Sequence, residues 1–271
     1  MAVSVGLTKE PVLLLNMFTF SLTSQLTQAH DLNMFNSQKT RSTSEATRPL
    51  VLNTALGLFR ERGVDAVTMR EIAKSAHIAL GAAYYYFPCK EAMVQAYYDQ
   101  VQADHFARVS TQFAEGKQNL LERLRIAFHS KFGILKGDRK LLGALFRYAG
   151  EPEHQLSVLG AATEANRQRS IAVFKLAING ERLPEDIRAL LPTALWALSM
   201  GFLLYFIYDD SPQQERTYKL IDGALELLVR LLSLAKSPLF KPFRGSLFAL
   251  LRDTGLLAEP MSPVPHSPQE V

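Results

Sequence analysis

The segment Ile78–Glu91, IALGAAYYYFPCKE, sets three consecutive tyrosines after a run of small and apolar residues. Successive side chains of an α-helix advance by about 100° around its axis, so the three rings cannot all face one core. On a helical wheel, Ala83 and Phe87 fall on one side, which we take as the inward face. The outward face and its flanks carry Gly81, Ala82, Tyr84, Tyr85 and Tyr86. Such a helix can approach a large partner closely.

Two further helices are predicted just upstream. Residues 49–62 place apolar side chains at helical spacing and are followed by Gly63, a natural helix stop. Thr68 and Glu71 form the pattern of a capping box, in which each side chain accepts the other residue's backbone N–H, so a second helix begins there. Residues 76–79 have the length of the turn in a helix-turn-helix, with His77 where glycine is usual.

Double-stranded DNA is the partner that suits these helices. A phenol ring offers an apolar face to a thymine methyl group and a hydroxyl to a phosphate, and Arg70 can reach the same groove. Between Lys39 and Lys90, eight Lys or Arg outnumber four Asp or Glu. The alternative is that Tyr84–Tyr86 pack against the following helix. The capping box, the tight turn and the basic surplus together favour DNA.

The stretch Ala55–Tyr98, ALGLFRERGVDAVTMREIAKSAHIALGAAYYYFPCKEAMVQAYY, resembles the DNA-binding domain of TetR-type transcriptional regulators. The resemblance spans about residues 49–98 and rests on the T-x-R-x-I-A and Y-Y-x-F-P-x-K-E patterns in the right order and spacing. It implies an all-helical homodimer with an N-terminal helix-turn-helix. It also implies a larger helical domain that holds an effector pocket and dimerises through its last two long helices.

The resemblance assigns roles to single residues. Thr68 would cap the second helix and touch a phosphate, Arg70 would contact a base or phosphate, and Lys90 would contact a phosphate. The tyrosines would meet the groove and the DNA backbone. The candidate DNA-contacting residues are Thr68, Arg70, Gly81, Ala82, Tyr84, Tyr85, Tyr86 and Lys90. Cys89 stands at the predicted start of the next helix, either as a weak cap or as a redox-sensitive thiol.

The rest of the chain predicts an all-α protein. Periodic segments suggest helices near residues 90–115, 119–135, 139–149, 155–178, 185–208 and 212–235. Aromatic residues recur on them and are usually core, but in the resembling family part of such a set lines a ligand cavity. The candidate pocket residues are Phe128, Phe132, Phe146, Phe174 and Trp196. An apolar lining would suit a small hydrophobic or aromatic effector.

Twenty residues, Ala189–Tyr208, carry no formal charge, which is long enough to cross a bilayer. Pro192 and Ser199 interrupt the run and no basic cluster flanks it, so a helix buried in a bundle is the preferred interpretation. With the amphipathic helix that follows, it could form a four-helix interface across a two-fold axis. We therefore expect a homodimer and no membrane.

Four segments are expected along the chain. Residues 1–43 form a disordered or mis-annotated leader, with Met34 a candidate start and little sign of a signal peptide. Residues 44–92 form the helix-turn-helix domain and residues 93–236 the effector-binding and dimerisation domain. Residues 237–271, with six prolines, are mostly irregular apart from a short helix near 246–252.

The chain shows no catalytic motif, no metal-ligand spacing and no cofactor signature, and its single cysteine fits a cytoplasmic protein. His154, in a polar loop, is more typical of a structural than a catalytic histidine. The sequence predicts a ligand-responsive transcriptional regulator, not an enzyme. We expect a repressor that binds an inverted-repeat operator as a homodimer and is released by its effector. The alternative is a helical interaction or membrane-associated protein that has lost sequence-specific DNA binding.

Overall fold

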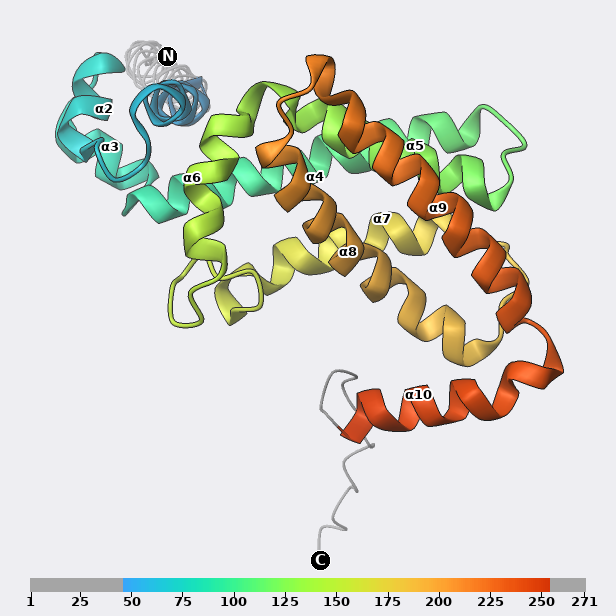
Figure 1. Ribbon diagram of the computed structural model, residues 1–271. Helices are drawn as coiled ribbons and strands as arrows, with labels where there is room; N and C mark the ends of the chain where they lie inside the picture. Colours follow the sequence, from blue (N-terminus) through green and yellow to red (C-terminus); the bar gives the residue numbers. More distant parts are fainter. Residues whose placement is uncertain (1–45, 254–271) are drawn as a thin grey trace, which may run out of the picture.

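The computed structural model describes residues 46–253, and the regular elements in this range are all helical, which confirms the all-α class (Figure 1). The first helix covers residues 46–62 of this range. The other α-helices are α2 Met69–Ser75, α3 Leu80–Tyr86, α4 Lys90–Ala114, α5 Leu120–Leu135, α6 Arg139–Ala149, α7 Glu164–Ala177, α8 Glu185–Tyr208, α9 Glu215–Ala235 and α10 Lys241–Asp253. Short 3-10 turns lie at Lys136–Asp138, Ala161–Thr163, Pro212–Gln214 and Pro238–Phe240.

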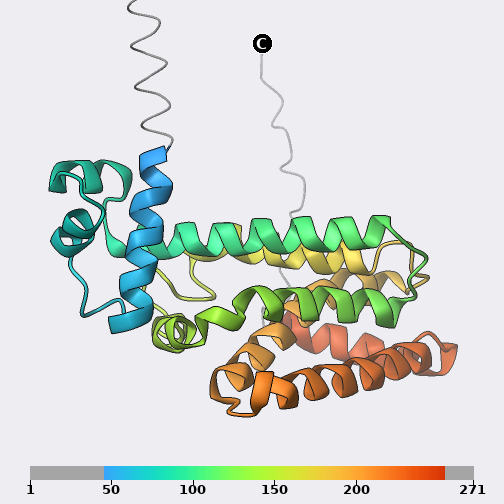
Figure 2. The same ribbon diagram turned by 90° about the horizontal axis from the view of Figure 1, so that it is seen from above.

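The helices form two parts joined by α4. The first helix, α2 and α3 make a small unit at one end of the molecule, and α4 runs from this unit along the length of the larger part (Figure 2). In the larger part, α4 packs on α5 and α7, α7 packs on α8, and α5 packs on α9. A helix-turn-helix domain is therefore followed by a larger helical domain, as predicted.

The small unit is organised by the predicted capping box. The Thr68 hydroxyl accepts the Glu71 N–H at 3.2 Å, and the Glu71 carboxylate accepts the Thr68 N–H at 2.8 Å. Arg62 also donates to Glu71, at 2.8 Å, and this bond together with those from Thr68 lowers the pKa of Glu71 to about 2. His77 adopts the left-handed conformation expected of the turn, with φ of 55°.

Two segments differ from the sequence prediction. Helix α7 begins at Glu164 rather than near residue 155, because the chain before it folds into a loop whose carbonyls are bound by side chains. Thr163 donates to the Ser157 carbonyl at 2.5 Å, and Arg167 donates to the Val158 carbonyl at 2.9 Å. Within the segment expected to be mostly irregular, α10 occupies residues 241–253. The predicted leader and the end of the tail lie outside the described residues.

Helix α8 is long and apolar enough to cross a membrane, although the core helix of a bundle meets the same criteria. One side of α8 is buried, with Leu195, Phe202 and Phe206 at most 5% exposed. This side packs against α6, α7 and α9. The buried side of this uncharged helix therefore packs inside the bundle.

A buried carboxylate fixes the turn between α8 and α9. Asp209 is 4% exposed, and its two oxygens accept four hydrogen bonds, from the backbone N–H and the hydroxyl of both Ser211 and Thr217. The distances are 2.6–3.0 Å. Although burial opposes ionisation, these donors hold the pKa of Asp209 well below its usual range.

Replacing Asp209 should destabilise the larger domain. Asp209→Ala leaves buried donors without an acceptor, so we expect a loss of about 2 kcal/mol or more in the free energy of unfolding, measured by urea denaturation. Asp210→Ala is the matched control, because its side chain is 87% exposed and its ion pair with Arg216 lies in solvent. Equal losses in the two variants would contradict the assignment.

Candidate DNA-binding surface and effector cavity

Helix α3 presents its tyrosines as the helical wheel predicts. Ala83 and Phe87 are buried, whereas Tyr85 is 80% exposed and Tyr84 is 48% exposed. The half-buried Tyr86 meets the Tyr85 ring edge-on, with 5.2 Å between the ring centroids. The exposed side chains of Tyr84 and Tyr85 are therefore available to a partner.

The other candidate DNA-contacting residues lie on α3 itself and at the starts of α2 and α4. Thr68, Arg70 and Gly81 are exposed and Ala82 is half-buried. The N-cap of α3, Ala79, makes no side-chain hydrogen bond to the helix. A surface built from glycine, alanine and tyrosine has few hydrogen-bond donors, so its shape and its phenol hydroxyls dominate what it can recognise.

Lys90 and Cys89 begin α4 and have local contacts. The Lys90 ammonium donates to the Val64 carbonyl at 2.7 Å and to the Asp65 carbonyl at 3.5 Å, so it ties α4 to the loop before α2. A phosphate contact by Lys90 stays a prediction. Cys89 is the half-buried N-cap of α4 and makes no side-chain capping bond. A redox-sensitive thiol stays the alternative to a weak cap.

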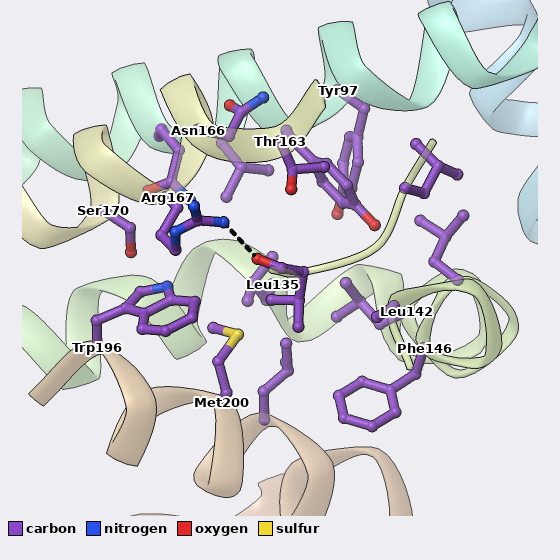
Figure 3. Close-up of a pocket in the computed structure, with 18 of the residues that line it drawn as sticks. Tyr97, Leu135, Leu142, Phe146, Thr163, Asn166, Arg167, Ser170, Trp196 and Met200 are labelled. Carbon is purple, nitrogen blue, oxygen red and sulfur yellow. Dashed lines mark hydrogen bonds between the residues drawn. The ribbon is translucent and has the colours of Figure 1, made fainter. Parts of the chain in front are cut away.

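A cavity of about 210 Å³ lies inside the larger domain, between α4, α5, α6, α7 and α8 and the loop after α6 (Figure 3). Phe146 and Trp196, two of the five candidate pocket residues, line it. The other three fill the neighbouring core instead. Phe128 lies 5.1 Å from Phe174 and 5.5 Å from Phe202, and Phe132 lies 5.2 Å from Phe206, as ring centroids. The faces of α5 and α7 that bear these rings turn towards α8.

The cavity also has lining residues that a search for aromatic side chains missed. Tyr97 and Tyr98 come from α4, Lys131 from α5, and Asn166 and Ser170 from α7. Lys131 carried a signal in the sequence, because it continues the apolar stripe of α5 at helical spacing. The stripe reads Leu124, Phe128, Lys131 and Leu135. A charge in such a stripe indicates a buried cation.

One wall of the cavity is linked to the small unit through a buried carboxylate. Tyr97 donates to Asp138 at 2.7 Å, and Asp138 in turn accepts from Arg60 of the first helix at 2.5 Å. Asp138 is 8% exposed. Burial and the bond to Asp138 together raise the pKa of Tyr97 well above its usual range, so its hydroxyl stays a donor. Two hydrogen bonds that share Asp138 thus connect the cavity wall to the first helix.

A second, exposed contact joins α6 to the loop before α2. Asp65 accepts from Arg147 at 3.1 Å and from the hydroxyl of Tyr148. The His154 ring stacks on Tyr148 with 4.5 Å between centroids, and its Nδ1 accepts the Leu156 N–H at 3.0 Å. These contacts give His154 a structural place in the loop. The cavity-lining Phe146 directly precedes Arg147, so α6 touches both the cavity and the small unit.

Helices α8 and α9 expose apolar side chains at helical spacing. The sequence pattern suggested a single apolar side for α9, but the structure divides it, with Ile221, Leu225 and Leu232 inward. The outward stripe of α9 is Leu220, Leu227, Leu231 and Leu234, each 43–61% exposed. On α8, exposed small residues precede exposed large ones: Ala194, Ala197, Gly201, Leu204, Tyr205 and Tyr208. We call these two stripes the α8–α9 face.

The small unit exposes two helices, α2 and α3, joined by a tight turn, and the larger domain holds a cavity. These features define an all-helical helix-turn-helix regulator. Residues 51–97 match the model of bacterial regulatory proteins of the tetR family, and residues 123–244 match a tetracyclin repressor-like C-terminal domain. The chain belongs to the TetR family of transcriptional regulators.

Among residues 46–253, no cluster of three His, Cys, Asp or Glu side chains is placed to hold a metal ion.

Sequence relatives match the N-terminal region. The chain is 46% identical over 55 residues to the uncharacterised HTH-type regulator YuxN of Bacillus subtilis, a match that covers 19% of each chain. It is 35% identical over 75 residues to TtgR of Pseudomonas putida, covering 27% of this chain and 36% of TtgR. The matches thus span about a fifth to a third of these relatives.

Solved structures share the fold over most of their length. A TetR regulator from Nitrosomonas europaea aligns with a TM-score of 0.55 at 18% identity, covering 66% of this chain and 96% of that one. FadR from Thermus thermophilus, a TetR family repressor in complex with lauroyl-CoA, aligns with a TM-score of 0.51 at 27% identity. The alignment covers 68% of this chain and 92% of FadR.

The bond from Tyr97 to Asp138 should contribute to stability. Tyr97→Phe removes a donor from a buried carboxylate, so we expect a loss of about 1–3 kcal/mol in the free energy of unfolding, measured by urea denaturation. Tyr98→Phe is the matched control, because Tyr98 also lines the cavity but its hydroxyl has no hydrogen-bond partner among the described residues. A control change larger than that of Tyr97→Phe would refute the role of this bond.

Proposed function

We propose that this protein is a one-component transcriptional repressor that binds an inverted-repeat operator as a homodimer and releases it when a small, largely apolar effector enters the cavity. The observation that carries the proposal is the pair of contacts from Tyr97 through Asp138 to Arg60. They join the wall of an apolar cavity to the domain that exposes Tyr84 and Tyr85. A chain with these parts acts in the cytoplasm and needs no catalytic residue.

Helix α3 is the proposed recognition helix. Its exposed face is narrow, because Gly81 and Ala82 flank the tyrosines, and a narrow helix can lie deep in the major groove. Arg70 projects from the start of α2 beside it and can meet a base edge or a phosphate. The small number of other donors favours readout by shape and by contact with thymine methyl groups.

The α8–α9 face is the proposed dimer interface. Its leucines and tyrosines are 40–78% exposed, and monomeric proteins seldom leave large apolar patches in water. The small residues Ala194, Ala197 and Gly201 let a partner helix approach closely. Pairing of this face with its own copy across a two-fold axis gives two recognition helices, which read two half-sites.

An apolar effector suits the cavity, whose lining is mainly leucine, aromatic and methionine side chains. FadR of Thermus thermophilus, which shares the fold, is described in complex with an acyl-coenzyme A, so an acyl or similar chain is a reasonable model for the apolar part. An effector releases DNA only if it binds better to the dimer form that does not match the operator. Movement of Tyr97 or α6 would carry that preference to the small unit.

The DNA-binding surface can be tested by fluorescence anisotropy with the DNA upstream of the protein's own gene. Arg70→Ala and Tyr85→Ala should each weaken binding about fivefold or more, because each removes a contact worth at least about 1 kcal/mol. Lys117→Ala is the matched control for the loss of one positive charge, because Lys117 is exposed in the loop at the far end of α4 (Figure 2).

If the upstream DNA shows no preference over scrambled DNA, selection from random sequences should recover the operator. A folded protein that selects no sequence would refute DNA recognition. Equal weakening by Arg70→Ala and Lys117→Ala would move the interface away from α2.

The dimer interface can be tested by sedimentation. Leu227→Glu puts a charge in the centre of the α8–α9 face, where Leu227 is 60% exposed, so the protein should shift from dimer to monomer. Leu159→Glu is the control, because Leu159 is 71% exposed in the loop before α7, away from this face. A Leu227→Glu protein that remains dimeric would place the interface elsewhere.

A further inference from the structure

One end of the cavity is polar and the other is apolar. Figure 3 shows Asn166, Arg167 and Ser170 of α7 gathered near Trp196, whereas Leu142 and Phe146 of α6 lie at the opposite end. Leu145 and Leu156 are among the other lining residues. A ligand that satisfies both ends has a polar head and a compact apolar body.

The polar end has two charged lining residues, Lys131 and Arg167. The side chain of Lys131 is fully enclosed, and its ammonium donates to the Ser170 hydroxyl at 3.1 Å. An ammonium carries three donors, and among the described residues this hydroxyl is the acceptor that Lys131 reaches. No carboxylate in this part of the chain forms an ion pair with it. Lys131 is thus a buried cation without a counter-ion in residues 46–253.

The surroundings of Lys131 do not supply that counter-ion. His105 lies nearby, and burial together with the charge of Lys131 lowers its pKa to about 4, so the ring is neutral at pH 7. Burial alone lowers the pKa of Lys131 to about 8, with no acidic side chain acting against it. The lysine therefore keeps its proton at neutral pH despite the cost of burying a charge.

Three further polar atoms near Lys131 or the cavity lack partners, and one of them is Nδ1 of His105. The side-chain oxygens of Gln102 and Asn166 are buried without a hydrogen bond, and both residues line the cavity. Arg167 differs, because its guanidinium is already held by Glu164 and by the Val158 carbonyl. The two amide oxygens are acceptors, so an anion cannot bond to them, and the charged donor left unused at the polar end is the Lys131 ammonium.

We propose that the effector is a carboxylic acid whose carboxylate binds the Lys131 ammonium and whose apolar body extends between α6 and α8. This inference rests on the proposed function, since it names the chemical class of the effector of the same cavity. A cavity of about 210 Å³ limits the body to a short alkyl chain or a single aromatic ring. A carboxylate supplies the counter-ion that Lys131 lacks and accepts hydrogen bonds from the remaining N–H groups of the ammonium.

The single tryptophan of the chain allows a direct test. Trp196 lines the cavity, so ligand binding to the full-length protein can be followed by its intrinsic fluorescence without a label. The probes are octanoate and phenylbutyrate, each with its amide and its alcohol, and octanoyl-coenzyme A. We expect each acid to bind about tenfold more tightly than its amide and alcohol, because its hydrogen bond to Lys131 is charge-assisted.

Two lysine variants separate the role of Lys131 from general effects. Lys131→Met keeps the length of the side chain and removes the charge, so the preference for the acid over its amide and alcohol should disappear. Lys136→Met is the matched control, because Lys136 follows α5 directly but is exposed and bonds to Gln213. Its preference for the acid should equal that of the unchanged protein. Thermal denaturation of each variant checks that it is folded.

Several results would overturn the inference. Neutral analogues that bind as tightly as the acids, a Lys131→Met protein that keeps the preference, or the failure of both acids to bind would each do so. Binding of octanoyl-coenzyme A without octanoate would favour an acyl thioester instead. The operator assay is scored separately. Release of DNA by a neutral compound alone would sustain the proposed function and refute the acid, whereas lysine-dependent acid binding without DNA release would do the reverse.

Discussion

The coupling between the two parts of the molecule depends on the carboxylate of Asp138. A carboxylate that is 8% exposed is costly unless donors surround it. Its donors among the described residues come from different parts: Arg60 from the first helix and Tyr97 from α4. Moving either donor away leaves a buried charge poorly satisfied. The orientation of the small unit and the wall of the cavity are therefore constrained together, which a purely apolar contact would not achieve.

Helix α4 adds stiffness to this arrangement. Its 25 residues begin at the Lys90 contact with the loop before α2 and pass the cavity at Tyr97, Tyr98 and Gln102. A continuous helix turns a small displacement beside the cavity into a rotation of the unit at its end. Since α6 contacts Asp65 through exposed groups that solvent screens, the buried bridge through Asp138 is the stronger of the two connections.

Local rules predicted most of the helices, and three-dimensional packing decided what they missed. The capping box at Thr68 and the inward and outward faces of α3 follow from residue spacing alone. The sequence was therefore enough to predict which side of α3 is exposed. The loop before α7 could not be foreseen, because its carbonyls are satisfied by Thr163 and by Arg167, which lies on the next helix. Phe146 and Trp196 line the cavity, and the other three candidate pocket residues do not, for a similar reason. An aromatic residue reads the same in sequence whether it faces a cavity, as Phe146 does, or a neighbouring ring, as Phe128 does.

Lys131 shows how an unfavourable feature can serve a ligand. In a domain without ligand, an enclosed ammonium with one neutral acceptor destabilises the fold relative to a methionine of similar length. An anion that enters the cavity removes this cost, so its binding free energy includes the relief of a strain already present in the protein. The same relief is absent for a neutral ligand of equal shape. A buried cation thus provides selectivity for acids, because only an anion removes the cost of the unpaired charge in the ligand-free protein. This selectivity requires no additional contacts to the apolar body of the ligand.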